Sequence, residues 1–212
     1  TETAKKNLIK ENLGKRAYVV GNIMYDSFLF FTQKMDSSPP IVQDCFGKTW
    51  EIPKDFYYLT CHREENTFSD TPLNEILAAM NELDSPTIYP VHPRNRERAL
   101  RLVQANHYSQ VKLIPPVKYS ESVWLTNHAK KIVTDSGGLQ CEAFFARKQC
   151  VTVFHYKVWP ETLVGNRNQL SEPRKEEILE KLSAKQVIDE CYQPFGDGNT
   201  ADRIVHLIKT KL

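Results

Sequence analysis

Residues Val133 to Glu142 read Val-Thr-Asp-Ser-Gly-Gly-Leu-Gln-Cys-Glu, and this stretch decides the fold. An apolar run ends at Thr134, an Asp-Ser-Gly-Gly turn follows, and apolar residues then recur at helical spacing. The pattern predicts a β-strand that enters an α-helix through a tight turn. Backbone N–H groups at the start of such a helix suit a diphosphate. Glu142, about one turn further on, is placed to accept hydrogen bonds from two ribose hydroxyls. The alternative is an ordinary tight turn without a ligand.

Outside this stretch, apolar strand-like runs alternate with amphipathic helical segments, which is typical of a parallel sheet covered by helices. The expected strands are Ala17–Val20, Phe56–Cys61, Thr87–Val91, Val111–Ile114, Lys131–Thr134 and Cys150–Val153. The expected helices are Ile23–Lys34, Pro72–Leu83, Arg96–Asn106, Ser120–Ala129, Leu139–Ala146, Arg174–Leu182 and Thr200–Lys211, with Thr1–Leu13 also helical in rhythm. Residues Ser37–Lys54 are expected to form an extended connection. The sequence predicts an α/β fold with one doubly wound parallel sheet, in a single Rossmann-like domain over residues 1–212.

The composition excludes several classes of partner. The chain has 212 residues, with 28 Lys and Arg against 26 Asp and Glu, and the charges are interspersed. Nothing in this pattern is typical of a nucleic-acid surface or of a basic membrane-binding face. No apolar stretch approaches the roughly 18 residues that a membrane span needs. The first residues lack both a signal-peptide pattern and an initiating Met, so we expect a piece of a longer protein.

The cysteines predict free thiols rather than a metal site or disulfides. There are five, at positions 45, 61, 141, 150 and 191, with no Cys-x-x-Cys pair and no zinc-like spacing with histidine. An odd number of scattered cysteines favours a reduced, cytoplasmic setting. The run Gly196-Asp197-Gly198-Asn199 is expected to be a turn that starts the last helix, with a metal site as the alternative.

Polar residues follow successive expected strands, where a doubly wound sheet binds its ligands. His62 and Arg63 follow Phe56–Cys61, and His92 and Arg94 follow the next strand. A histidine there can donate to a phosphate or transfer a proton, and arginine can pair with an anionic group. The alternative is that the histidines only satisfy loop backbone groups. No Gly-x-Gly-x-x-Gly follows the first strand and no P-loop motif occurs, so nicotinamide dinucleotides and P-loop chemistry are disfavoured.

Together these segments resemble the C-terminal half of the non-hydrolysing UDP-N-acetylglucosamine 2-epimerases and related UDP-sugar 2-epimerases. The matching blocks occur in family order across nearly the whole chain. They are Gly21-Asn22 with Asp26, His62-Arg63-Glu64-Glu65-Asn66, Pro90-Val91-His92-Pro93-Arg94, Thr134-Asp135-Ser136-Gly137-Gly138-Leu139-Gln140 with Glu142-Ala143, Trp159-Pro160-Glu161 and Pro194-Phe195-Gly196-Asp197-Gly198.

The resemblance implies the C-terminal half of a GT-B architecture, in which two Rossmann-like domains face each other across a cleft. It implies that Ser136, Gly137 and Gly138 contact the diphosphate of UDP and that Glu142 contacts the ribose. His62 is implied to be catalytic, next to the phosphates and the reacting sugar. Arg63, His92 and Arg94 are implied to line the UDP site.

The family's chemistry removes the proton at C2 of the sugar, eliminates UDP to leave a bound glycal, and adds UDP back with C2 inverted. The resemblance therefore implies a UDP-sugar substrate of the UDP-GlcNAc to UDP-ManNAc type, in surface polysaccharide biosynthesis, with no metal or cofactor. The family's proton-transfer carboxylates belong to an N-terminal domain that this chain does not include. The chain alone is expected to bind UDP weakly and to be inactive. A homodimer is a possible assembly.

Three departures from the family's pattern concern the identity of the sugar. Cys141 stands where the family usually has Glu or Lys, and Ser122 stands near a usual aromatic residue, for which Tyr119 or Trp124 are candidate substitutes. The segment 155–158 replaces a stretch that usually contains arginine. Two other functions stay open: the donor-binding domain of a GT-B UDP-sugar glycosyltransferase, and a non-catalytic nucleotide-binding module.

Overall fold

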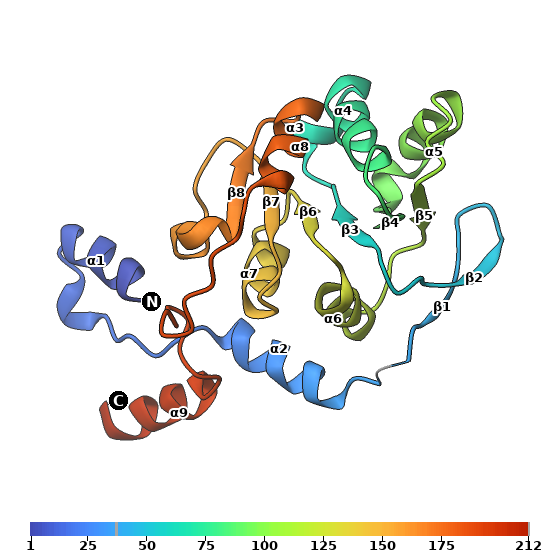
Figure 1. The fold of residues 1–212 in the computed structure, drawn as a ribbon. Helices are drawn as coiled ribbons and strands as arrows, with labels where there is room; N and C mark the ends of the chain where they lie inside the picture. Colours follow the sequence, from blue (N-terminus) through green and yellow to red (C-terminus); the bar gives the residue numbers. More distant parts are fainter. Residues whose placement is uncertain (37, 212) are drawn as a thin grey trace. The chain divides into compact units, whose positions relative to one another are not determined.

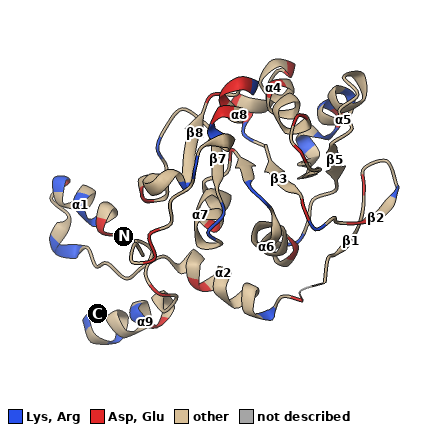
Figure 2. Cartoon of the chain, viewed as in Figure 1, with Lys and Arg blue, Asp and Glu red and all other residues tan. Residues whose placement is uncertain are grey.

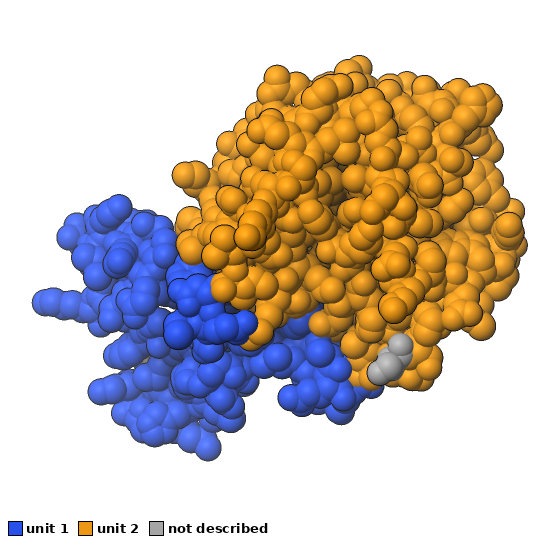
Figure 3. Space-filling model, in the orientation of Figure 1, with its two compact units in different colours: residues 1–34, 189–212 blue, residues 35–188 orange. Residues whose placement is uncertain are grey.

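The structure, a computed structural model, describes residues 1–36 and 38–211. The chain divides into two compact units, which are coloured in Figure 3. Residues 1–34 and 189–212 form the terminal unit, and residues 35–188 form the sheet unit. All the strands expected to carry site residues lie in the sheet unit.

A six-stranded parallel sheet forms the centre of the sheet unit. Its strands are β3 (Tyr57–Thr60), β4 (Thr87–Pro90), β5 (Val111–Ile114), β6 (Ile132–Thr134), β7 (Cys150–Val153) and β8 (Asn168–Ser171). In space they are ordered β5-β4-β3-β6-β7-β8. The chain thus builds outward from β3 in one direction, then returns and builds outward in the other. This reversal between β3 and β6 makes the sheet doubly wound, as predicted.

Helices cover both faces of this sheet (Figure 1). One face packs against α4 (Asp70–Asn81), α5 (Arg96–Ala105) and α8 (Lys175–Ser183), and the other against α6 (Tyr119–His128) and α7 (Gly137–Phe145). Successive strand residues alternate between the two cores, as their opposite orientations require. In β3, for example, Leu59 lies in the first core and Tyr58 in the second.

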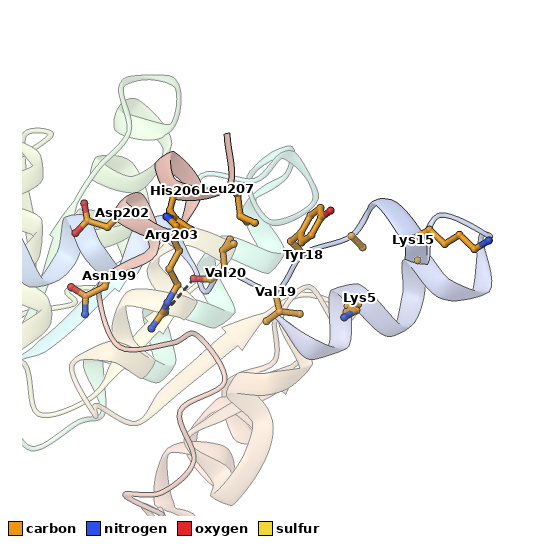
Figure 4. A pocket seen from close by; sticks show the side chains of 12 residues that line it. Lys5, Lys15, Tyr18, Val19, Val20, Asn199, Asp202, Arg203, His206 and Leu207 are labelled. Carbon is orange, nitrogen blue, oxygen red and sulfur yellow. Dashed lines mark hydrogen bonds between the residues drawn. The ribbon is translucent and has the colours of Figure 1, made fainter. Parts of the chain in front are cut away.

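The terminal unit consists of α1 (Glu2–Lys10), the 3-10 turn η1 (Gly14–Arg16), α2 (Ile23–Lys34) and α9 (Thr200–Lys211). Few of its residues are buried: α1 has none, α2 buries Phe28, and α9 buries Thr200. A cavity of about 780 Å³ lies within this unit, and Figure 4 shows its lining side chains. A hydrogen bond from Arg203 Nη1 to the carbonyl of Val20 (3.4 Å) lies at its wall.

The helices predicted between residues 23 and 211 are confirmed to within two residues at each end, and α1 ends three residues before the expected Leu13. The strand predictions need two corrections. Ala17–Val20 is not a strand, because the described residues of the terminal unit offer it no neighbouring strand with which to form a ladder. The edge strand β8 was not predicted, because its sequence Asn-Gln-Leu-Ser is polar. Its polar side chains are satisfied internally, since Asn168 Oδ1 accepts from Thr152 Oγ1 (2.6 Å) and Gln169 donates to the carbonyl of Lys181 (2.8 Å).

The expected connection Ser37–Lys54 begins at a residue outside the described part of the chain. Its described part contains an antiparallel hairpin of β1 (Ile41–Gln43) and β2 (Thr49–Glu51). Three other short elements follow strand ends: α3 (Glu64–Thr67) and the 3-10 turns η2 (Pro93–Asn95) and η3 (Pro160–Asn166). Acidic and basic residues are interspersed over the sheet unit (Figure 2). None of the helices within residues 1–36 and 38–211 is long and apolar enough to cross a bilayer.

Candidate functional site

A pocket of about 320 Å³ opens at the carboxyl ends of β3, β4 and β6. This is the place where the strand order reverses, and where open α/β sheets bind their ligands. Residues from all three strand ends and from α6 and α7 line it: Tyr58, Thr60, Cys61, His62, Pro90, His92, Pro116, Val117, Tyr119, Ser122, Ser136, Gly138, Leu139 and Glu142. Five of the eight predicted site residues are among them. Arg63, Arg94 and Gly137 are not.

The start of α7 forms part of the lining of this pocket, which we call the switch-point pocket because it lies where the strand order reverses. Ser136 is the N-cap, with extended backbone angles, and its hydroxyl accepts from the N–H of Leu139 at 3.4 Å. The N–H of Ser136 donates to Thr134 Oγ1 (2.9 Å), which anchors the turn to β6. The N–H groups of Gly137 and Gly138 belong to the first turn and have no intrahelical carbonyl to bond. The strand–turn–helix is confirmed, and its first turn has free backbone donors and the positive end of the helix dipole.

Glu142 lies in the wall of the pocket, on the same helix as this turn. It is only 7% exposed, and burial raises its pKa to about 7, although a hydrogen bond from the Tyr119 hydroxyl opposes this shift. Tyr119, at the start of α6, also lines the pocket. A buried carboxylate beside an open cavity needs further donors, and the vicinal hydroxyls of a ribose would supply two.

Asp135 holds together the loop that carries His62. Its side chain is fully buried, and its two carboxylate oxygens accept from the backbone N–H groups of His62 (2.9 and 3.0 Å) and Arg63 (2.8 Å). The side-chain amide of Asn66 donates to the same carboxylate at 3.3 Å and to the carbonyl of Val153 at 2.9 Å. Asp135 is therefore the structural link between β6 and the loop after β3.

The two predicted histidines come together at the mouth of the pocket. The rings of His62 and His92 lie 6.2 Å apart between centroids. His92 Nδ1 accepts from the backbone N–H of Arg94 at 3.2 Å, so the N–H of its neutral ring is on Nε2. His62 Nδ1 lies 3.2 Å from Asp135 Oδ1. Both rings are thus oriented by partners from outside the cavity.

Neither of the two predicted arginines lines the pocket. Arg63 Nε donates to the carbonyl of Asp135 (2.7 Å), and its guanidinium lies 4.9 Å from the centre of the Phe154 ring and 5.3 Å from that of Tyr156. Its Nη1 also donates to the Tyr156 hydroxyl. These contacts bind Arg63 to the segment after β7. The side chain of Arg94 is exposed and lines none of the pocket.

Another wall of the pocket is apolar. Pro90, Pro116 and Val117 line it, and the Tyr58 hydroxyl lies 3.0 Å from Ser122 Oγ. Of the two candidate aromatic substitutes, only Tyr119 lines the pocket. Trp124 is buried and stacks on Phe56 and His128 instead.

Sequence reasoning did not identify Asp135 as the link between two strand ends, nor Tyr119 as the partner of Glu142. The position of Asp135 directly after a strand was the available signal. Its partners come from 69 to 73 residues away in the chain, so spacing alone could not reveal them.

The described residues offer no competing metal centre. Within residues 1–36 and 38–211, no group of three or more His, Cys, Asp or Glu side chains is placed to hold a metal ion. All five cysteines are free, as predicted, and three of them are buried. Gly196 and Gly198 both have positive φ angles (87°), and Asp197 accepts from the N–H of Asn199 at 3.2 Å. This run therefore forms the expected turn before α9.

Comparison with known proteins agrees with the geometry. The family model described as UDP-N-acetylglucosamine 2-epimerase matches residues 1–209. The chain is 38% identical over 214 residues to a UDP-N-acetylglucosamine 2-epimerase homolog of Methanococcus maripaludis, covering 99% of this chain and 59% of that protein. It is 33% identical to the UDP-2,3-diacetamido-2,3-dideoxy-D-glucuronate 2-epimerase of Pseudomonas aeruginosa, covering 98% of this chain and 58% of that protein.

Solved structures show the same relationship. The UDP-GlcNAc 2-epimerase of Methanocaldococcus jannaschii, crystallised with UDP-GlcNAc and UDP, matches 99% of this chain and 59% of its own with 28% identity and a TM-score of 0.76. The enzyme of Neisseria meningitidis shares the fold, with a TM-score of 0.77 over all of this chain and 60% of that one, at 22% identity. The chain thus spans about three fifths of the length of these relatives. By the family match over residues 1–209, the chain belongs to the UDP-N-acetylglucosamine 2-epimerase family.

Proposed function

We propose that the protein containing this chain is a UDP-sugar 2-epimerase, and that this chain supplies its UDP-binding half, the C-terminal half of a GT-B architecture. One observation carries the proposal: the switch-point pocket combines a helix N-terminus, a buried carboxylate and an oriented histidine. The helix N-terminus suits the diphosphate of UDP, the carboxylate suits its ribose, and the histidine suits the phosphate oxygen at which the bond to the sugar breaks.

In this proposal, the backbone of Gly137 and Gly138 and the hydroxyl of Ser136 bind the diphosphate at the start of α7. Glu142 accepts hydrogen bonds from the ribose hydroxyls, and the uracil lies against the apolar wall of Pro116 and Val117. The distance between these groups along α7 suits a nucleoside diphosphate, since five residues of helix span about 7.5 Å.

The reaction that this site serves is an elimination followed by a re-addition. A base removes the proton at C2 of the sugar, and the C–H electron pair forms a C1–C2 double bond. The C1–O bond breaks with its electrons going to the β-phosphate oxygen of UDP. Re-addition of UDP at C1 and of a proton on the other face of C2 completes the inversion. The start of α7 and a hydrogen bond from His62 stabilise the charge that develops on UDP.

The base lies outside this chain in this account. Of the carboxylates around the pocket, Asp135 is fully buried by loop donors and Glu142 is assigned to the ribose. The relatives are longer than this chain, and we propose that their additional part supplies the proton-transfer groups. The chain alone should therefore bind UDP weakly and leave UDP-sugars unchanged.

We place the reaction in the cytoplasm, in surface polysaccharide biosynthesis. The five free thiols are compatible with a reducing compartment. The sugar is a 2-acetamido sugar in this proposal, because the names of the relatives refer to UDP-N-acetylglucosamine and to a UDP-diacetamido-glucuronate.

A second candidate function would use the same helix start and the same carboxylate. The donor domain of a GT-B glycosyltransferase also binds a nucleotide diphosphate at a helix start and a ribose at a carboxylate. The family match over residues 1–209 favours the epimerase.

Isotope exchange distinguishes the two functions. The full-length protein is incubated with UDP-GlcNAc in D₂O without an acceptor, and deuterium at C2 is followed by NMR. An epimerase incorporates deuterium at C2 and forms the C2 epimer. A requirement for an acceptor, with no exchange at C2, would support the transferase instead. The diacetamido-uronate nucleotide is the second substrate to test.

A further inference from the structure

We propose that Asp135 is a positioning residue that holds the His62 ring with Nε2 directed to the phosphate of the bound nucleotide. The inference rests on the proposed function, because it names a group that prepares His62 for the departure of UDP. Asp135 itself does not touch the substrate.

The geometry first shows a buried acceptor beside a partly open ring. The Asp135 side chain is 0% exposed, whereas the His62 side chain is 44% exposed and lines the pocket. The 3.2 Å contact joins His62 Nδ1 to Oδ1 of the buried Asp135 carboxylate. The other ring nitrogen, Nε2, is therefore the one available to a ligand.

The backbone contacts make this arrangement rigid. The same carboxylate accepts the N–H groups of His62 and Arg63 at 2.8 to 3.0 Å and the amide of Asn66 at 3.3 Å. The backbone and the ring of His62 thus both contact the Asp135 carboxylate. The two strands are also linked just before these loops, where Thr60 Oγ1 and Thr134 Oγ1 lie 2.6 Å apart. Loop motion that would turn the ring must break several of these contacts together.

The carboxylate also decides which nitrogen carries the proton. An ionised carboxylate is only an acceptor, so the neutral ring keeps its proton on Nδ1 and leaves the lone pair on Nε2. When the ring is protonated, the added proton sits on Nε2 and can be donated to a phosphate oxygen, while the carboxylate offsets the positive charge. A purely loop-bracing carboxylate would need the backbone contacts but not the contact to Nδ1.

Among the described residues that line the pocket with His62, His92 is the second histidine. His92 lies 6.2 Å away and is oriented by the N–H of Arg94 rather than by a carboxylate. The thiol of Cys61 precedes His62 and is buried. Burial raises the pKa of this thiol, and Asp135 raises it further, so the thiol stays neutral and does not compete for the charge.

The test uses the full-length protein with ¹⁵N-labelled histidine, and the His62 signal is assigned by its loss in His62→Gln. Long-range ¹H–¹⁵N spectra at a pH where the ring is neutral report which nitrogen is protonated. We expect the Nδ1–H form in the wild type and its loss in Asp135→Asn. The matched control is Asn66→Ala, which removes one donor to the same carboxylate and should leave the His62 tautomer unchanged.

Kinetics on the same variants test the consequence for the reaction. Asp135→Asn should lower kcat by about 100-fold or more, as expected for loss of an oriented proton donor, while KM and the Kd for UDP change by less than about threefold. His62→Gln should lower kcat to a similar extent. The double variant should be no slower than the slower single variant, because both changes remove the same function.

Several outcomes would overturn the inference. One is an Nε2–H ring in the wild type, which needs no variant and so does not depend on Asp135→Asn folding. Another is a folded Asp135→Asn protein with wild-type kcat. A wild-type protein that shows the Nδ1–H ring but no exchange at C2 would support the positioning and overturn the proposed epimerase function.

Discussion

Glu142 is the residue whose environment is hardest to explain without a ligand. It is 7% exposed, and its pKa is raised to about 7 because burial disfavours the charged form. A carboxylate kept in such a place has a cost in stability. Tyr119 offsets part of that cost with one hydrogen bond. The ribose hydroxyls offset more of it in our account.

Replacing this carboxylate by its amide tests that assignment. Glu142→Gln should weaken UDP binding by about 1–3 kcal/mol, the range for losing charge-assisted hydrogen bonds. Isothermal titration calorimetry with the full-length protein measures the effect. Cys141→Ala, at the neighbouring buried position outside the pocket, is the control and should change the affinity little. Equal losses in both variants would mean that α7 is oriented differently from our description.

The raised pKa of Glu142 also predicts a pH dependence of stability. The folded protein binds this proton more tightly than the unfolded chain, in which the pKa has its ordinary value of 4.5. The contribution of Glu142 to stability is therefore full below about pH 4.5 and is lost as the pH rises through about 7. Relative to wild type, Glu142→Gln should gain at most about 3 kcal/mol between pH 5 and pH 8. Denaturant unfolding without UDP measures this, and parallel curves for both proteins would contradict it.

Residue types alone identified the side chains that line the pocket better than the side chains that orient them. His62, His92, Ser136 and Gly138 follow the ends of strands or begin a helix, and Glu142 lies about one turn into that helix, so their position could be read from local patterns. The roles of Asp135 and Tyr119 depend on contacts between distant segments. The contacts of the Arg63 guanidinium with the rings of Phe154 and Tyr156 likewise join segments far apart in the chain.

At the scale of elements, a turn at Gly165 in η3 brings the backbone of η3 against the backbone at Val187. Gly165 has a φ of 69°, and its carbonyl accepts from the N–H of Val187 at 2.7 Å. A Cβ added at Gly165 would collide with the carbonyl oxygen of Val187. Only glycine fits, since both the backbone angle and the close approach exclude a side chain.

Alanine substitutions at two glycines separate these two effects. Gly47, in the β1–β2 hairpin, has a φ of 88° but no atom within 4 Å of an added Cβ. Gly47→Ala should cost about 1–2 kcal/mol of unfolding free energy from backbone strain alone. Gly165→Ala should cost about 1–3 kcal/mol more, because the neighbouring backbone must also move. Denaturant titration measures both, and equal costs would show that the Gly165–Val187 approach is unimportant.

The helices and central strands were predictable because their apolar periods match their burial. The strand β8 was not, because an edge strand can carry polar side chains when tertiary partners satisfy them. The apolar segment Ala17–Val20 shows the opposite case. It has the composition of a strand, but a strand exists only where a neighbour completes its ladder.

For the whole molecule, the order β5-β4-β3-β6-β7-β8 explains why the site lies where it does. The reversal between β3 and β6 separates the loops that follow these strands and leaves space between them. Alternation of strands and helices along the sequence predicted the doubly wound class. Which strands lie side by side depends on how the chain crosses over, and this information is not local. Asp135 bridges the loops at the reversal, which places His62 beside the start of α7.

The central claim is that one pocket binds a diphosphate at the start of α7 and a ribose at Glu142. A crystal structure of the full-length protein soaked with UDP tests it most directly. We predict phosphate oxygens within hydrogen-bonding distance of the Gly138 N–H and the Ser136 hydroxyl, with both ribose hydroxyls donating to Glu142. UDP bound outside this pocket, or bound in it with the ribose remote from Glu142, would contradict the account.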